Sequence, residues 1–220
     1  MNNKSLFCGF LIVAVMFFGC KKEAPQAPAE EEQTQSMQPM TPVEQQATQT
    51  ERNVVEAKKK LVKLETTMGD IVIEMNEDAA PGTVKNFLQY VRSGFYDGTI
   101  FHRIIPGFMI QGGGFTAEMV RKEPGAPVKN EYKESNVRGT IAMAKLGGDP
   151  DSATCQFFIN LEDNGANLDN QNGGFTVFGK VIEGMDVVDK IAKVQTTTKM
   201  GMRDVPAEPV VIKSAKVVSE

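Results

Sequence analysis

Residues 101–113 read FHRIIPGFMIQGG and are the most informative stretch of this 220-residue chain. Arg103 stands among large apolar residues in a segment typical of a strand. Phe108 and Met109 follow a Pro-Gly turn, and Gln111 supplies a side-chain amide two residues later. A cation, an amide and an apolar surface are therefore expected to lie close together.

Short apolar strands are expected on both sides of this stretch, separated by glycine-rich turns. The predicted strands are Leu61–Thr66, Ile71–Met75, Thr99–Ile105, Phe108–Gln111, Thr140–Ala144, Gln156–Leu161, Thr176–Val181 and Glu208–Val218. Apolar residues at helical spacing between Pro81 and Gly94 predict one helix, and Gly184–Ala192 predict a second. Because strands and helices do not alternate, we predict a mainly β fold, a closed eight-stranded antiparallel barrel capped by two α-helices.

Three conspicuous features of this region have structural interpretations. The run Gly112–Gly114 is interpreted as a tight barrel turn, because no Lys-Ser/Thr pair follows it as in a phosphate-binding loop. His102 is the only histidine, and a single imidazole without partner ligands is poor evidence for a metal or a catalytic triad. Cys155 is interpreted as a buried, inert thiol.

Strand alternation predicts that one of Phe157 and Phe158 faces the core and the other a groove.

The charge balance argues against a nucleic-acid-binding protein. The chain has 24 Lys+Arg and 28 Asp+Glu, a formal net charge of −4. No strongly basic face is implied that could displace counterions from phosphates, so nucleic acid is not an expected partner.

The folded part is expected to span residues 61–220. Residues 21–60 contain no Gly, Phe, Tyr or Trp and are rich in Pro, Glu, Gln and Thr. Such a segment buries too little apolar surface to offset its chain entropy, so residues 20–60 are predicted to be a disordered tether.

Residues 1–20 read MNNKSLFCGFLIVAVMFFGC, in which the apolar run ends at Gly19-Cys20. The run of about 13 residues is too short to cross a hydrocarbon core, which needs about 20. Its ending resembles the lipobox of bacterial lipoproteins, which implies a signal peptide at residues 1–19 and lipid attachment at Cys20. The protein is then expected in the cell envelope, lipid-anchored and facing the periplasm or the cell exterior. A plain signal peptide and an uncleaved anchor remain alternatives.

The opening stretch resembles the signature of the cyclophilins, which are peptidyl-prolyl cis-trans isomerases. Three later blocks resemble cyclophilin motifs in the same order, namely GTIAMA at 139–144, SATCQFFI at 152–159 and FGKVIEGM at 178–185. The resemblance implies a barrel that accelerates rotation about X–Pro bonds, and a lone short motif would be far weaker evidence.

The resemblance also implies roles for individual residues. Arg103 matches the catalytic arginine, and Gln111 matches a glutamine that binds substrate backbone and helps orient that arginine. The implied substrate-binding residues are Phe108, Met109, Phe158 and Leu168 in the proline pocket, with Ala144 and Gln156 in the neighbouring groove. No metal or cofactor enters such a mechanism, and proline-containing polypeptides are the implied partners of an expected monomer.

The sequence departs from the best-known cyclophilin pattern at three places that bear on substrate preference. Asn167 stands where the family often has a groove tryptophan, and Phe175 stands where a histidine is common at the pocket rim. Lys145-Leu146 replaces a small polar pair.

We therefore expect a prolyl isomerase that assists the folding of exported or envelope proteins. One rival is a membrane-tethered chaperone or adaptor that binds proline-containing segments without catalysis. Another is a purely structural lipoprotein, which would not need to keep Arg103, Phe108, Gln111 and Phe158 together. A structural arginine paired with a core carboxylate is the alternative for Arg103.

Overall fold

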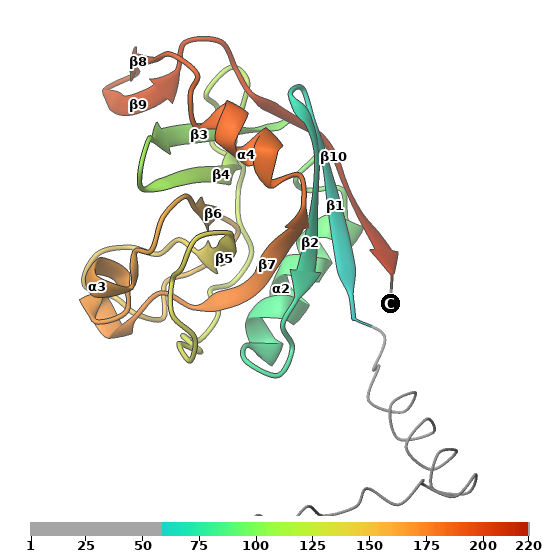
Figure 1. The fold of residues 1–220 in the computed structure, drawn as a ribbon, viewed down its shortest axis with the longest axis vertical. Helices are drawn as coiled ribbons and strands as arrows, with labels where there is room; N and C mark the ends of the chain where they lie inside the picture. The colour runs from blue at the N-terminus through green and yellow to red at the C-terminus, as the bar shows by residue number, and fades with distance from the viewer. Residues whose placement is uncertain (1–58, 220) are drawn as a thin grey trace, which may run out of the picture. The chain divides into compact units, whose positions relative to one another are not determined.

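The computed structural model describes residues 59–219 (Figure 1). The predicted signal peptide, the lipid attachment at Cys20 and nearly all of the predicted tether lie outside the described residues.

Eight strands of the described region close into an antiparallel barrel in the order β1-β10-β3-β4-β6-β5-β7-β2. Their bounds are β1 Leu61–Thr66, β2 Gly69–Met75, β3 Thr99–Ile105, β4 Met109–Thr116, β5 Thr140–Met143, β6 Phe157–Asn160, β7 Val177–Glu183 and β10 Val211–Ser219. The predicted mainly β barrel is confirmed. It joins the first and last strands of the folded part side by side, as Figure 1 shows at β1 and β10.

Buried and more exposed side chains alternate along β1 and β2, and the buried ones fill the barrel interior. In β1 the side chains of Val62 and Leu64 are fully buried, and in β2 those of Ile71 and Ile73 are fully buried. Polar neighbours between them point to the surface, because successive side chains of a strand face opposite sides. The two predicted strands are confirmed, and they pair antiparallel as a hairpin.

Both predicted helices are present. Helix α2 runs over Pro81–Arg92, begins with proline at its first turn and packs against β7 and β10. Helix α4 runs over Met185–Ile191 and packs against β2. The two helices lie at opposite ends of the barrel in Figure 1. Within residues 59–219, no helix combines the length and apolar character that crossing a membrane requires.

An aromatic cluster fills the barrel beneath α2. Its members are fully buried, and they are Phe87, Tyr96, Phe101, Phe157 and Phe178. Phe87 lies at the centre, with its ring centroid 5.0 Å from that of Phe178 and 5.2 Å from that of Tyr96. The Phe87 centroid also lies 5.6 Å from that of Phe157, so contacts at the separations typical of stabilising aromatic pairs join α2 to strands β6 and β7.

The interpretation of Gly112–Gly114 as a turn is wrong, because all three glycines lie inside β4. They are required by packing. A Cβ at Gly113 would lie 2.8 Å from the Tyr96 ring and 2.9 Å from the Phe157 ring, and one at Gly114 would lie 2.6 Å from the Gln156 side chain. Side chains of the aromatic core and of the site described below therefore pack directly against the backbone of this strand.

Three short elements were not predicted, and each lacks an apolar periodic pattern. They are the single-turn helix α3 at Gly165–Leu168, the 3₁₀ turn η1 at Gln171–Gly173 and the hairpin of β8 Thr196–Lys199 with β9 Met202–Pro206. Residues Thr196, Thr197 and Thr198 are exposed, so β8 shows no alternation. The hairpin is held at Val205, which is buried against Ile100.

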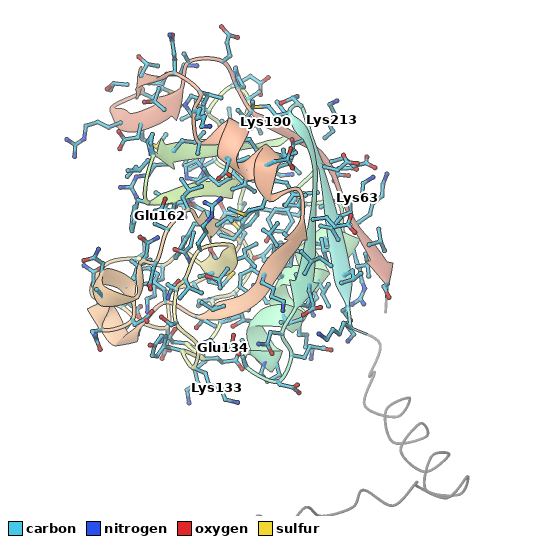
Figure 2. All side chains as sticks on the ribbon, in the orientation of Figure 1. Lys63, Lys133, Glu134, Glu162, Lys190 and Lys213 are labelled. Atoms are coloured by element: carbon cyan, nitrogen blue, oxygen red, sulfur yellow. The ribbon has the colours of Figure 1, made fainter. Side chains whose placement is uncertain are left out.

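Charged side chains are spread over several elements, and some of them form ion pairs. Figure 2 labels Lys63 on β1, Lys190 on α4 and Lys213 on β10. The Lys63 ammonium lies 2.8 Å from an Asp70 carboxylate oxygen, and the Lys190 ammonium lies 2.8 Å from Asp186. Such exposed pairs contribute little stability, at most about 1 kcal/mol each.

A distant glutamate supplies the N-terminal cap of α2. Glu131 accepts hydrogen bonds from the Gly82 N–H at 3.0 Å and from the Thr83 N–H at 2.8 Å, and the Thr83 hydroxyl donates to it at 2.8 Å. Burial opposes ionisation of this carboxyl, but the bonds from Thr83 and Gly82 outweigh it, and its pKa is lowered from 4.5. The carboxylate therefore stabilises the fold above its unfolded pKa, and this contribution is lost as the pH falls below that value.

Glu131→Ala is expected to lower the free energy of unfolding by about 1–2 kcal/mol at pH 7, the usual cost of a lost cap. Denaturant titrations at pH 7 and pH 3 should show the difference from wild type shrinking at the lower pH, because the wild-type carboxylate is then becoming protonated. Glu162→Ala, at an exposed glutamate labelled in Figure 2, is the control and should change stability by less than about 0.5 kcal/mol. A difference for Glu131→Ala that grows toward pH 3 would contradict the capping role.

Candidate active site

Strand register places three of the predicted site residues in one row across β3, β4 and β6, and the row continues to Ala142 on β5. Arg103 on β3 pairs with Gln111 on β4. Gln111 pairs with Phe158 on β6, and Phe158 pairs with Ala142 on β5. Gln111 and Phe158, which are 47 positions apart in the chain, are thus direct neighbours in the barrel.

This row borders a cavity of about 360 Å³, here called the first cavity. Its lining residues are Arg103, Phe108, Met109, Gln111, Ala144, Lys145, Phe158, Leu168, Gln171 and Phe175. The structure therefore brings together seven of the eight predicted catalytic and substrate-binding residues. The eighth, Gln156, lines a second cavity of about 230 Å³, together with Gln111 and Ala144.

The Arg103 side chain is exposed and makes no hydrogen bond or ion pair with any residue in the described part of the chain. The alternative of a structural arginine paired with a core carboxylate is therefore wrong. An always-charged group with five N–H donors therefore lines the first cavity, where it is free to donate to a ligand.

The Gln111 amide is held by Gln156. Its Nε2 donates to the Gln156 side-chain oxygen at 2.9 Å, and no hydrogen bond joins it to Arg103. The bond fixes the Gln111 amide between the two cavities and leaves its own carbonyl oxygen free to accept from a ligand.

The base of the first cavity is apolar and closely packed. Met109, Phe158 and Leu168 are 2%, 4% and 5% exposed, and they form a hydrophobic cluster with Val177. Phe157 instead belongs to the barrel core, so the predicted division between Phe157 and Phe158 is confirmed. An apolar ring of about the size of proline would lose its water contact on entering this cavity.

A network of buried asparagines fixes the backbone at Phe108, a residue that lines the first cavity. The Phe108 carbonyl accepts from Asn164 Nδ2 at 2.8 Å and from the Leu161 N–H at 2.9 Å. Asn164 Nδ2 also donates to Asn160 at 2.8 Å, and Asn160 Nδ2 donates to Asn136 at 3.2 Å. Sequence reasoning missed this network, because each asparagine taken alone is typical of a loop or turn.

Sequence reasoning also assigned no lining role to Lys145 and Gln171. The Phe175 ring forms the rim, with its centroid 5.7 Å from that of Phe158 in an edge-on arrangement. The Lys145 ammonium lies 4.8 Å from the Phe175 centroid, a cation–π contact. The signal that pointed to Phe175 and Lys145 was their departure from the cyclophilin pattern.

His102 lies behind the site rather than in it. Its side chain is buried with the ring centroid 4.7 Å from that of Phe115, and its Nδ1 has no hydrogen-bond partner among residues 59–219. Burial, and next the charge of Arg103, lower the pKa of His102 to about 4, so the imidazole is neutral at pH 7. The structural interpretation of this histidine agrees with its place in the barrel wall.

Cys155 is a free, buried thiol beside the aromatic core. Its carbonyl accepts a hydrogen bond from the Tyr96 hydroxyl at 2.8 Å, and burial raises the pKa of its thiol. A thiol held in its protonated form is a poor nucleophile, as expected for a structural cysteine.

A family model described as cyclophilin type peptidyl-prolyl cis-trans isomerase/CLD matches residues 61–217. Peptidyl-prolyl cis-trans isomerase cyp18 of Streptomyces antibioticus is 55% identical over 164 residues, which cover 71% of this chain and 98% of that protein. Peptidyl-prolyl cis-trans isomerase B of Escherichia coli is 52% identical over 165 residues, covering 71% of this chain and 99% of that protein.

The fold is also similar to solved structures. A Cryptosporidium parvum cyclophilin type peptidyl-prolyl cis-trans isomerase superposes with a TM-score of 0.61 at 28% identity, covering 74% of this chain and 99% of its own. The same protein crystallised in the presence of the dipeptide Ala-Pro gives a TM-score of 0.61 and covers 73% of this chain.

Proposed function

Because the chain belongs to the cyclophilin family of peptidyl-prolyl cis-trans isomerases, it accelerates rotation about X–Pro bonds, and we propose that its substrates are exported or envelope proteins. In this proposal a lipid at Cys20 anchors a monomer to a membrane, and residues 20–60 tether the barrel outside the cytoplasm. The N-terminal sequence supports the anchor, since Gly19-Cys20 follows an apolar run.

The chemistry of the reaction defines what the site has to do. Rotation of a peptide bond meets a barrier of about 18–20 kcal/mol, because the C–N bond has partial double-bond character. No covalent bond is broken. The catalyst has only to bind the twisted amide more tightly than the planar forms, and a 10⁵-fold gain needs about 7 kcal/mol of such differential binding.

We propose that the first cavity does this by holding the proline ring while Arg103 donates to the proline nitrogen. In the twisted amide this nitrogen regains a lone pair that can accept a hydrogen bond, whereas in the planar amide the pair is delocalised. The observation that carries the mechanism is the unpartnered Arg103 side chain in the lining of a cavity with an apolar base. Gln111, fixed by Gln156, binds the substrate backbone and limits its movement during rotation.

The substrate assignment follows from the kinetics of folding. Uncatalysed X–Pro isomerisation takes tens to hundreds of seconds and can limit the rate at which a chain folds. A tethered isomerase would meet such chains as they emerge at the membrane. The Cryptosporidium parvum structure obtained in the presence of the dipeptide Ala-Pro supports short Ala-Pro peptides as first test substrates.

Cys20→Ser is expected to abolish lipid attachment in a bacterium that acylates lipoproteins. Full-length wild type should partition into the detergent phase and carry an acylated N-terminal cysteine by mass spectrometry. The variant should keep an unprocessed N-terminus and its isomerase activity, because the barrel strands begin only at Leu61 in the sequence. An unmodified Cys20 in the wild type would overturn the anchor without affecting the activity.

A further inference from the structure

The second cavity adjoins the first and offers a place for another part of the substrate. The two cavities share Gln111, Ala144 and Lys145 in their walls. An extended residue spans only about 3.3–3.6 Å, so a chain whose proline occupies the first cavity passes the second within a few residues.

Lys145 is a cation fixed at the boundary between the two cavities. Its ammonium donates to the carbonyl oxygens of Asn172 at 2.7 Å and Gly174 at 2.6 Å. Asn172 and Gly174 have φ values of 52° and 74°, a left-handed backbone that persists where surrounding contacts hold it. Two of the three ammonium donors are thus used. Besides its cation–π contact with Phe175, the ammonium has no further hydrogen-bond acceptor among the described residues.

The environment of Lys145 favours an anionic partner for that free donor. Burial lowers the pKa of Lys145, and the carboxylate of Asp151 acts in the opposite direction. Asp151 itself does not line the cavity, and it accepts a hydrogen bond from the Asn130 N–H at 2.8 Å. A carboxylate placed against this partly dehydrated ammonium would form a charge-assisted hydrogen bond, which is stronger than a neutral one.

Arg121 is the second cation of this cavity. Its side chain is exposed and forms no hydrogen bond or ion pair within residues 59–219. A planar guanidinium suits a carboxylate, because two parallel N–H groups can donate to its two oxygens. None of the residues lining the cavity in the described structure is acidic, so the positive charge of Arg121 and Lys145 is not balanced inside it.

We propose that the second cavity binds the carboxylate of an acidic substrate residue between Arg121 and Lys145, within about three residues of the proline. The inference rests on the isomerase activity of the first cavity and names the substrates that it favours, prolines in acidic segments.

A peptide series tests this preference with the full-length protein. Glutamate is placed in turn at each of the three positions before and after an Ala-Pro pair, with glutamine and lysine peptides as counterparts. We expect glutamate at one position to raise kcat/KM about three- to tenfold over glutamine, the range for two partly exposed charge pairs, and lysine to lower it. The advantage should shrink in 0.5 M salt, because partly exposed charges are screened.

Two arginine variants assign the effect to the cavity. Arg121→Gln should reduce the glutamate-to-glutamine ratio of kcat/KM at least twofold. Arg203→Gln, at an exposed arginine of β9 that lines neither cavity, should leave the ratio unchanged. Catalysis of the glutamine peptides with no glutamate preference at any position, or a preference that persists in Arg121→Gln, would overturn the inference. Absence of catalysis toward every peptide would instead contradict the activity itself.

Discussion

Arg103→Ala is expected to lower kcat/KM for an Ala-Pro peptide by about 10²–10³-fold, because one preorganised charged donor contributes about 3–4 kcal/mol in a transition state. The Arg103 guanidinium is the only group that we assign to the nitrogen of the twisting bond. The measurement is a protease-coupled isomerase assay over a range of enzyme concentrations, corrected for the uncatalysed rate.

The fold should survive this change. Arg103 is exposed and forms no hydrogen bond or ion pair in the described part of the molecule, so the thermal unfolding midpoint should stay close to that of wild type. Arg203→Ala serves as the control and should keep full activity. If Arg103→Ala retained activity within threefold of wild type, the assigned role of Arg103 would be wrong.

Phe157→Ala should instead lower the free energy of unfolding by about 3–5 kcal/mol, the usual cost of removing a buried aromatic ring. The Phe157 ring is fully buried, with centroids 5.4 Å from Tyr96 and 5.6 Å from Phe87. On the β4 side no side chain can move into the cavity that alanine would leave, because the residue next to the ring there is Gly113. Denaturant unfolding monitored by circular dichroism measures the loss.

Phe158→Ala is the matched comparison, one residue away on the opposite face of β6. Its ring borders the first cavity, so alanine should chiefly raise KM for an Ala-Pro peptide by removing about 1–3 kcal/mol of proline-ring burial. Its stability cost should be clearly smaller than that of Phe157→Ala. Equal stability losses with an unchanged KM would show that the two faces of β6 are assigned wrongly.

Much of the barrel was predictable, because its strands and two longer helices bury apolar residues in a regular pattern. Val62 and Leu64 alternate with polar residues, and Val84, Phe87, Leu88 and Val91 of α2 recur at helical spacing. Local patterns of this kind follow directly from backbone geometry.

The glycine run of β4 shows where local patterns fail. Glycines usually indicate a turn, yet here they stay in the strand because Tyr96, Phe157 and Gln156 occupy the space that Cβ atoms would need. Those neighbours lie between 17 and 44 positions away in the sequence, so the cause is tertiary. The β8–β9 hairpin was missed for a related reason, since only Val205 and Pro206 are buried and no alternation marks it.

The composition of the site was predictable from motifs, but its connections were not. The motifs place Arg103, Gln111 and Phe158 in sequence, and only the barrel register puts them in one row. The hydrogen bond from Gln111 to Gln156 and the position of Lys145 depend on side chains from distant segments meeting. The spacing of residues in the sequence does not predict such contacts.

The most direct test separates an isomerase from a module that only binds proline-containing segments. Exchange NMR on an Ala-Pro peptide, with the full-length protein at a small fraction of the peptide concentration, measures cis-trans interconversion without a coupled reaction. The structure predicts exchange cross-peaks between the cis and trans resonances with wild type and strongly reduced exchange with Arg103→Ala. Peptide binding to wild type with no acceleration of exchange would contradict the central claim that this cavity catalyses X–Pro rotation.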